Sequence, residues 1–159
     1  LPDVTVITPV FVDGRAAFWL GSRGHHADIG GRTPGSGPPD STVIEEEGVV
    51  IDLFPLVAGG RLREAETRAL LGSGRWPCRS PDQNIADLKA QVAANETGRR
   101  ELLRVVDRHG AEVVAAYMGH VQRNAEECVR AVIDRLQDGS FSYPMDIGTV
   151  IQVRVSVDR

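Results

Sequence analysis

The chain has 159 residues, 42% of them hydrophobic and 25% charged, which suits one ordinary globular domain or a piece of a larger one. Its formal net charge of -4 disfavours nucleic acid as a partner, because phosphate binding needs clustered Lys and Arg side chains. No apolar run approaches the roughly 20 residues of a membrane-spanning helix, no leader peptide is visible and only two cysteines occur, so we expect a reduced, cytoplasmic protein.

The N-terminal segment is predicted to form a β-hairpin. Residues 4–12 and 16–21 are rich in β-branched and aromatic side chains, and Asp13-Gly14-Arg15 lies between them. An Asp-Gly pair between two apolar runs is a strong signal of a tight hairpin turn. Pro9 has no N–H to donate, so it places part of the first strand at an edge or a bulge.

Residues 23–47 are dense in Gly and Pro, which excludes long regular elements. A loop of this length inside a compact domain is usually functional or disordered. The acidic run Glu45-Glu46-Glu47 then leads into an expected strand at residues 49–57, which Gly59-Gly60 would end. A short helix is expected after it.

The second half is predicted to be mainly helical. Residues 80–83 combine an N-cap serine, a proline at the first helical position and a glutamine three residues after the cap. The apolar spacing predicts a helix that ends at Gly110, with its polar stretch 95–100 facing solvent or a partner. A second helix carries Cys128 on its apolar face and stops at Asp138-Gly139. Two helices joined by a tight turn are expected to form an antiparallel hairpin.

The chain closes on residues 150–157, where apolar and polar side chains alternate as in a half-buried strand. The fold class is therefore expected to be α+β, with the helical hairpin packed on a sheet. We divide the chain into strands and a Gly/Pro-rich site loop (1–60), a helical part (61–138) and terminal strands (139–159). Because the last strand has no successor to pair with, we expect a fragment of a larger domain.

The densest group of chemically capable side chains is the run from Arg23 to Gly31. Histidine and carboxylate side chains are good ligands for Zn, Mn or Fe. His25 and His26 are neighbours on an extended chain and point to opposite sides, so we do not expect both on one metal. Asp28 follows three residues after His25, and a Gly-rich bend is able to return it to that imidazole. The pair Gly30-Gly31 would let the backbone approach a ligand closely.

Hairpin geometry connects this run to Asp3. Counting outward from the turn at residues 13–14 brings residues near Asp3 beside residues near Arg23 to His25. We therefore expect Asp3 and His25 to meet at the open end of the hairpin. Taken without any resemblance, a His-His-x-Asp run in a loop is more often polar packing or surface than a metal site.

Other candidate groups carry weaker signals. His109 and His120, at a helix end and within a helix, are interpreted as structural, and Glu45–Glu47 as a solvated face or a strand entry. The Gly-rich loop lacks the Gly-Lys-Ser/Thr of a phosphate-binding P-loop. Nothing visible would lower the pKa of the Cys78 thiol, so a nucleophilic role for it is not expected.

Several long blocks resemble the hydantoinase B / 5-oxoprolinase family, in order along nearly the whole chain. They are residues 1–6 (LPDVTV), 22–31 (SRGHHADIGG), 33–36 (TPGS), 38–42 (PPDST), 84–95 (NIADLKAQVAAN) and 116–122 (AYMGHVQ). Blocks that stay in register are more specific than any single short motif. The last block is more similar to 5-oxoprolinase than to the acetone or acetophenone carboxylase relatives.

The resemblance implies a portion of an ATP-dependent lactam hydrolase, which for 5-oxoprolinase opens 5-oxo-L-proline to L-glutamate. A separate hydantoinase-A-like, kinase-like subunit or domain would use ATP and Mg to phosphorylate the lactam oxygen. The portion resembled here would then direct water to the activated ring. The implied partners are the small-molecule lactam and that ATP-using portion, in an oligomer, and the isolated piece is expected to be inactive.

The resemblance also carries over residue roles. Asp3 and His25 match positions of metal ligands, with Zn, Mn or Fe as the divalent metal, and Asp28 is the next candidate. His26 and Asp28 are carried over as candidate catalytic residues, with His26 orienting substrate or the surroundings of the metal. In relatives a His precedes the Leu-Pro-Asp segment and an acidic residue lies further upstream, and both would fall before Leu1. If they complete the site, this piece alone is expected to bind metal weakly or not at all.

Two rival interpretations stay open. The first is a carboxylase subunit of the same superfamily, which would consume bicarbonate instead of opening a lactam. The second is a non-catalytic interaction domain whose long helices dock a partner subunit. Neither composition nor spacing separates these from the lactam hydrolase.

Overall fold

The computed structural model describes residues 2–158 and has an α+β architecture, as predicted. The chain forms two compact units, Leu1–Arg104 and Val105–Arg159. The unit boundary therefore falls inside the segment that we predicted as one helical part. No helix among residues 2–158 has the length and apolar character needed to cross a membrane.

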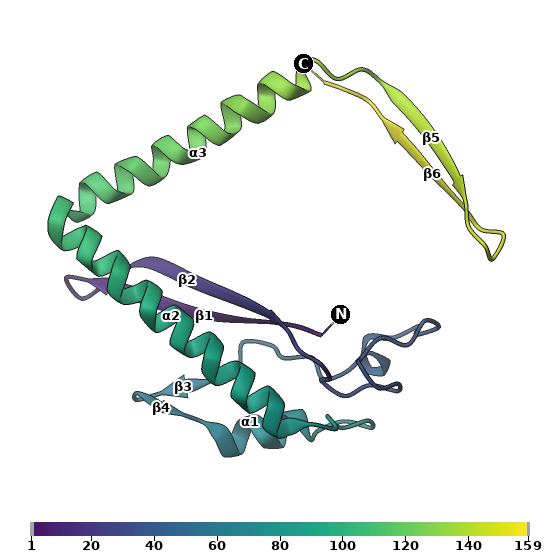
Figure 1. Cartoon of the computed structure of the whole chain (residues 1–159), viewed down its shortest axis with the longest axis horizontal. Helices are drawn as coiled ribbons and strands as arrows, with labels where there is room; N and C mark the ends of the chain where they lie inside the picture. The colour runs from purple at the N-terminus through teal and green to yellow at the C-terminus, as the bar shows by residue number, and fades with distance from the viewer. Residues whose placement is uncertain (1, 159) are drawn as a thin grey trace. The chain divides into compact units, whose positions relative to one another are not determined.

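The first unit begins with the predicted hairpin, in which β1 (Asp3–Val12) pairs antiparallel with β2 (Arg15–His25) (Figure 1). Asp13 and Gly14 both have positive φ, 50° and 75°, as a two-residue turn of the I′ type requires. The register shifts between Val10 and Phe11, next to the proline at position 9, where a bulge was expected. β2 is longer than predicted and ends at His25, so the loop begins at His26, three residues later than predicted.

Beyond the loop lie a short 3-10 helix (η1, Ile44–Glu46), a small hairpin of β3 (Val57–Ala58) and β4 (Arg61–Leu62), and the short helix α1 (Glu64–Leu71). The prediction of a strand over residues 49–57 is wrong, because only its last residue enters a strand. Leu53 has a φ of 44°, which an extended strand does not allow, and Pro55 lacks an N–H for a ladder.

Two long helices follow, α2 (Pro81–His109) and α3 (Ala111–Ile133). α2 begins at the proline that the sequence places at the first helical position. Gly110, with a φ of 85°, separates the helices as predicted, because this conformation ends a helix at little steric cost to glycine. Most of α2 belongs to the first unit and α3 to the second, so the antiparallel packing of the two helices stays a prediction.

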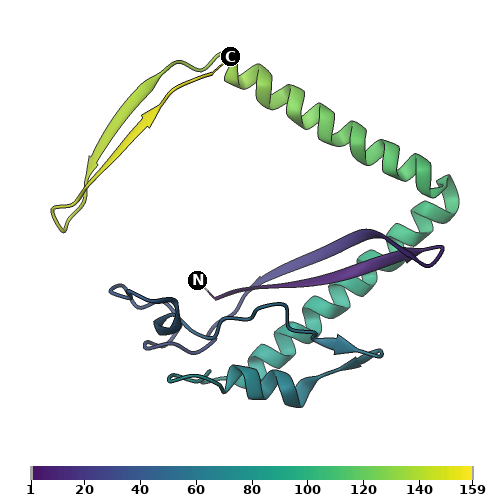
Figure 2. The same ribbon diagram turned by 180° about the vertical axis from the view of Figure 1, so that it is seen from behind.

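The core of the first unit lies where α2 crosses one face of the hairpin (Figure 1 and Figure 2). Its buried apolar side chains come from β1, the Gly-rich loop, α1 and α2: Val10, Ile29, Leu71, Ile85 and Leu88. Asn95, which was expected to face solvent or a partner, is instead 4% exposed. It is buried because its side-chain Nδ2 donates to the Val6 carbonyl of β1 and to Thr8 Oγ1.

In the second unit, β5 (Gly139–Pro144) and β6 (Val150–Val155) form an antiparallel hairpin. The C-terminal strand therefore has a partner, which the sequence analysis did not foresee. The prediction that the C-terminal strand is half-buried is wrong for the structure described, since every residue of β5 and β6 is exposed. Cys128, expected in a core, is exposed as well. A two-stranded hairpin buries side chains only where another layer covers it.

Candidate functional site

Asp3 and His25 face each other at the last paired position of the β1–β2 hairpin. Asp3 Oδ1 lies 2.9 Å from His25 Nδ1, so the expected meeting of these two side chains is confirmed. The imidazole is 65% exposed and the carboxylate 34%. Among the described residues, the other ring nitrogen of His25 has no hydrogen-bond partner. The pair thus offers a carboxylate and an imidazole nitrogen to a ligand from solvent.

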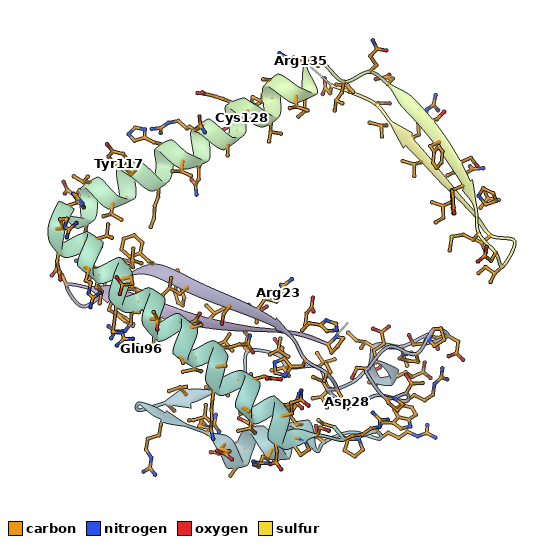
Figure 3. The ribbon with its side chains drawn as sticks, in the orientation of Figure 1. Arg23, Asp28, Glu96, Tyr117, Cys128 and Arg135 are labelled. Carbon is orange, nitrogen blue, oxygen red and sulfur yellow. The ribbon has the colours of Figure 1, made fainter. Side chains whose placement is uncertain are left out.

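The next pair on the same face of the hairpin adds a cation. Thr5 and Arg23 are register partners two residues further in, and Arg23 Nε donates to Thr5 Oγ1 at 3.0 Å. Figure 3 shows the labelled Arg23 on β2. Beside this end of β1 lies a pocket of about 270 Å³ lined by Asp3, Thr5, Ile29, Ile44 and residues 47–51. The open end of the hairpin therefore joins a polar surface to a pocket.

His26 lies on the opposite side of the chain from His25, as predicted for neighbours on a strand. Its side chain is 1% exposed, and its backbone N–H donates to the Pro2 carbonyl at 2.9 Å. Nδ1 lies 3.0 Å from Asn84 Nδ2, and Nε2 lies 3.1 Å from Gln91 Oε1. Because the Asn84 amide group is a donor, Nδ1 accepts and the ring carries its proton on Nε2. These contacts hold the ring, and a direct catalytic part for His26 stays a prediction.

Asp28, labelled in Figure 3, anchors the Gly-rich loop, and its hydrogen bonds go to that loop and to Arg79 instead of to Asp3 or His25. Its carboxylate accepts backbone N–H bonds from Gly30, Gly35 and Arg79, and it pairs with the Arg79 guanidinium at 2.8 Å. Burial opposes the ionised form, but these donors outweigh burial and lower the pKa of Asp28. Within residues 2–158, no three His, Cys, Asp or Glu side chains cluster as a metal would require. A catalytic part for Asp28 stays a prediction.

The paired glycines after Asp28 approach protein backbone. Gly30 and Gly31 have φ of 93° and 92°, and a Cβ on either would overlap backbone atoms of Trp76 or of residues 46–47. Gly31 N–H donates to the Trp76 carbonyl at 3.0 Å, and Ser36 Oγ accepts from Ile29 N–H at 2.8 Å. Glycine is required here so that the loop can pack against two other segments.

Sequence reasoning missed the side chains that hold this end of the hairpin from behind, Asn84, Gln91 and Arg79. Asn84 and Gln91 are buried, at 2% and 8% exposure, on the face of α2 that carries Ile85 and Leu88. A signal existed, because residues seven apart share a helix face, and amide side chains on an apolar face need polar partners. Arg79 had no such signal, since its partner lies far away in the sequence.

Comparison with known proteins identifies the relatives of this chain. The family model for hydantoinase B/oxoprolinase matches residues 1–159. A 5-oxoprolinase of Dictyostelium discoideum is 42% identical over 171 residues, covering 100% of this chain and 13% of the relative. A caprolactamase subunit beta of Pseudomonas jessenii is 34% identical over 88% of this chain and 23% of its own length.

A solved structure agrees with the sequence relatives. The crystal structure of ATP-dependent caprolactamase from Pseudomonas jessenii matches with a TM-score of 0.77 at 30% identity. The match covers 99% of this chain and 28% of the caprolactamase chain, so this chain corresponds to a minor part of each relative. The chain belongs to the hydantoinase B/oxoprolinase family.

Proposed function

We propose that this chain is a portion of an ATP-dependent cyclic amide hydrolase that opens 5-oxo-L-proline to L-glutamate. The observation that carries the proposal is the 42% identity to a 5-oxoprolinase along the whole chain. The likeness to an ATP-dependent caprolactamase supports the same reaction class on a different lactam. Because the chain spans 13% of the 5-oxoprolinase, turnover is assigned to the longer protein.

The chemistry explains why ATP is needed. An unstrained amide is a poor electrophile, and phosphorylation of the lactam oxygen turns that oxygen into a leaving group. A hydantoinase-A-like portion would carry out this step with ATP and Mg, and the caprolactamase subunit named beta is consistent with such a division of labour. Water then adds to the activated carbon, the ring C–N bond breaks as the nitrogen takes up a proton, and a second water hydrolyses the resulting acyl phosphate to carboxylate and phosphate. The portion described here would direct the first water and hold the ring.

Asp3 and His25 are the residues that would hold a divalent metal in this portion, with Zn, Mn or Fe as candidates. Asp3 Oδ1 and His25 Nδ1 lie 2.9 Å apart, so an ion held by both atoms, with bonds of about 2.1 Å, would take the place of the proton in that hydrogen bond. No third His, Cys, Asp or Glu joins them within the described part of the chain, so further ligands would come from elsewhere in the longer protein. When bound, such a metal would act as a Lewis acid and acidify water.

In this proposal the charged end of the hairpin handles the substrate. Arg23 supplies positive charge two residues from His25, on the face that Asp3 shares. His26 and Asp28 would contribute by holding the end of β2 and the loop after it, through contacts with Asn84, Gln91 and Arg79. A direct role in proton transfer for either residue is a separate proposal.

The test uses the full-length enzyme, with Asp3→Ala and His25→Ala. We expect wild type to cleave ATP only together with loss of 5-oxo-L-proline, and each variant to lose at least about 100-fold in rate, together with bound metal. Bicarbonate consumption without loss of the lactam would replace the proposal by the carboxylase interpretation. Unchanged turnover in both correctly folded variants would favour an interaction domain.

A further inference from the structure

A buried set of polar side chains on α2 holds the end of the hairpin that carries Asp3 and His25. Its centre is Gln91, whose Nε2 donates to the Val4 carbonyl of β1 and the Ser22 carbonyl of β2, both at 2.9 Å. One amide group therefore ties the two strands together. The contact is reciprocated, because Ser22 Oγ donates to the Gln91 backbone carbonyl at 3.2 Å.

The same side chain also holds the residue that follows His25. Gln91 Oε1 accepts from His26 Nε2 at 3.1 Å, while Asn84 Nδ2 donates to His26 Nδ1 at 3.0 Å. Both ring nitrogens are thereby committed to α2. Asn84 is held in turn, since its Nδ2 also donates to the Asp28 carbonyl and its Oδ1 accepts from Cys78 Sγ.

The fit of Gln91 against β2 is close. A Cβ built at Gly24, between Arg23 and His25, would lie 3.3 Å from the Gln91 side chain. The amide therefore reaches both strands because position 24 has no side chain. At Gly21, on the same strand, a Cβ would meet nothing within 4 Å.

This placement matters because the ends of a two-stranded hairpin are its weakest part. Asp3 and His25 occupy the last register pair, and both side chains face solvent to a large extent. A two-stranded hairpin is marginal by itself, and terminal pairs open most easily. A ligand pair must nevertheless be held to within about 0.5 Å for productive binding. The hydrogen bonds from Gln91 and Asn84 of α2, together called the clamp, supply this rigidity from the buried side.

We infer that Gln91 and His26 are positioning residues that set the separation of Asp3 and His25, with Gln91 as the principal one. The inference rests on the proposed function, in which that pair binds a divalent metal. Neither residue touches the metal or the substrate in this assignment. They act through the backbone of residues 4, 22 and 26, which flank the pair.

The main test compares Gln91→Met with Asn95→Leu in the full-length enzyme loaded with Co²⁺. Both changes remove a buried amide that donates from α2 to β1, but Asn95 contacts Val6 and Thr8, further from the pair. For Gln91→Met we expect Co²⁺ affinity to fall about 10- to 100-fold and the visible absorption spectrum of the ion to change. For Asn95→Leu we expect a lower melting temperature with affinity and spectrum unchanged.

A milder pair of variants keeps the test informative should Gln91→Met not fold. Gly24→Ala pushes on the Gln91 side chain, whereas Gly21→Ala has open space on the same strand. Gly24→Ala should weaken Co²⁺ binding several-fold, and Gly21→Ala should leave it unchanged. Equal Co²⁺ affinity in all four variants would overturn the positioning role.

The Asp3→Ala variant separates this inference from the function on which it rests. If Asp3→Ala binds Co²⁺ as tightly as wild type, the metal pair itself is wrong and the positioning role falls with it. If Asp3→Ala loses the ion but Gln91→Met and Gly24→Ala keep it, the metal pair stands and only the clamp is refuted. Loss in Asp3→Ala together with weakening in Gln91→Met supports both.

Discussion

Asp3 Oδ1 and His25 Nδ1 lie 2.9 Å apart, although 21 residues of chain separate the two side chains. The tight turn at Asp13-Gly14, the pairing of β1 with β2 and the register shift between Val10 and Phe11 bring them together. Because both are partly exposed, the contact adds little to the stability of the fold. A chemical role for the pair stays a proposal.

The first prediction concerns that stability. Asp3→Ala and His25→Ala should each change the free energy of unfolding by less than about 1 kcal/mol, because exposed ion pairs contribute about 0.2–1 kcal/mol. Urea unfolding of the full-length enzyme followed by fluorescence would measure it. A loss of several kcal/mol would mean that any loss of activity in these variants reflects unfolding.

The second prediction concerns acid sensitivity through Asp28. Its pKa is lowered in the folded state, so its contribution to stability is present above the unfolded pKa of about 3.9 and is lost as pH falls through the lower, folded pKa. Asp28→Asn should cost about 2 kcal/mol near neutral pH, because hydrogen bonds to a charged group are lost. The difference in stability between Asp28→Asn and wild type should narrow as the pH falls below about 4.

Melting temperatures of both proteins from pH 7 down to pH 3 would check this. Asp40, which pairs with Arg32 and has a side chain 74% exposed, gives the matched control. Asp40→Asn should produce little change at any pH. A difference in melting temperature between Asp28→Asn and wild type that stays constant with pH would contradict an ionised Asp28 carboxylate in the folded protein.

The third prediction concerns the glycine that lets the loop pack. Gly30→Ala places a Cβ against the Trp76 carbonyl at a positive φ and should cost more than about 3 kcal/mol. Gly74 has a similar φ of 86°, but a Cβ there meets nothing within 4 Å, so Gly74→Ala should cost only about 1–2 kcal/mol. Denaturant midpoints of the two variants give the comparison. Equal losses of stability in the two variants would show that the positive φ alone, without the close approach of Trp76, explains the glycine at position 30.

The fourth prediction concerns the thiol of Cys78. Burial raises its pKa and the neighbouring Asp28 charge raises it further, against lowering by the Ser80 N–H and Arg79. Less thiolate is then present at a given pH, and the sulfur donates to the Asp28 carbonyl and Asn84 Oδ1. In a Cys128→Ser background, iodoacetamide at pH 8 should label Cys78 at least about 10-fold more slowly than after unfolding. Rapid labelling of the native protein would show that the thiol is accessible and ionised.

Local chemistry explains which parts of the fold the sequence could predict. The Asp-Gly turn folds the two strands into a hairpin, the Ser-Pro start and Gly110 bound α2, and alternation along an extended chain separates His25 from His26. Prediction failed where the outcome depends on what a segment packs against. Residues 49–56 are apolar enough for a strand but include Leu53 at positive φ and Pro55, and β6 has a strand pattern without a covering layer.

The sequence by itself placed Asp3 close to His25, because a two-residue turn folds the first strand back on the second. The register shift between Val10 and Phe11 then sets Asp3 opposite His25 and not opposite Gly24. Only the tertiary structure decided what stands behind that pair. Gln91 and Asn84 reach His26 across 65 and 58 residues of chain, and Arg79 reaches Asp28 across 51. Such contacts depend on how α2 docks on the hairpin, which is settled by side-chain packing between distant segments and by no local pattern.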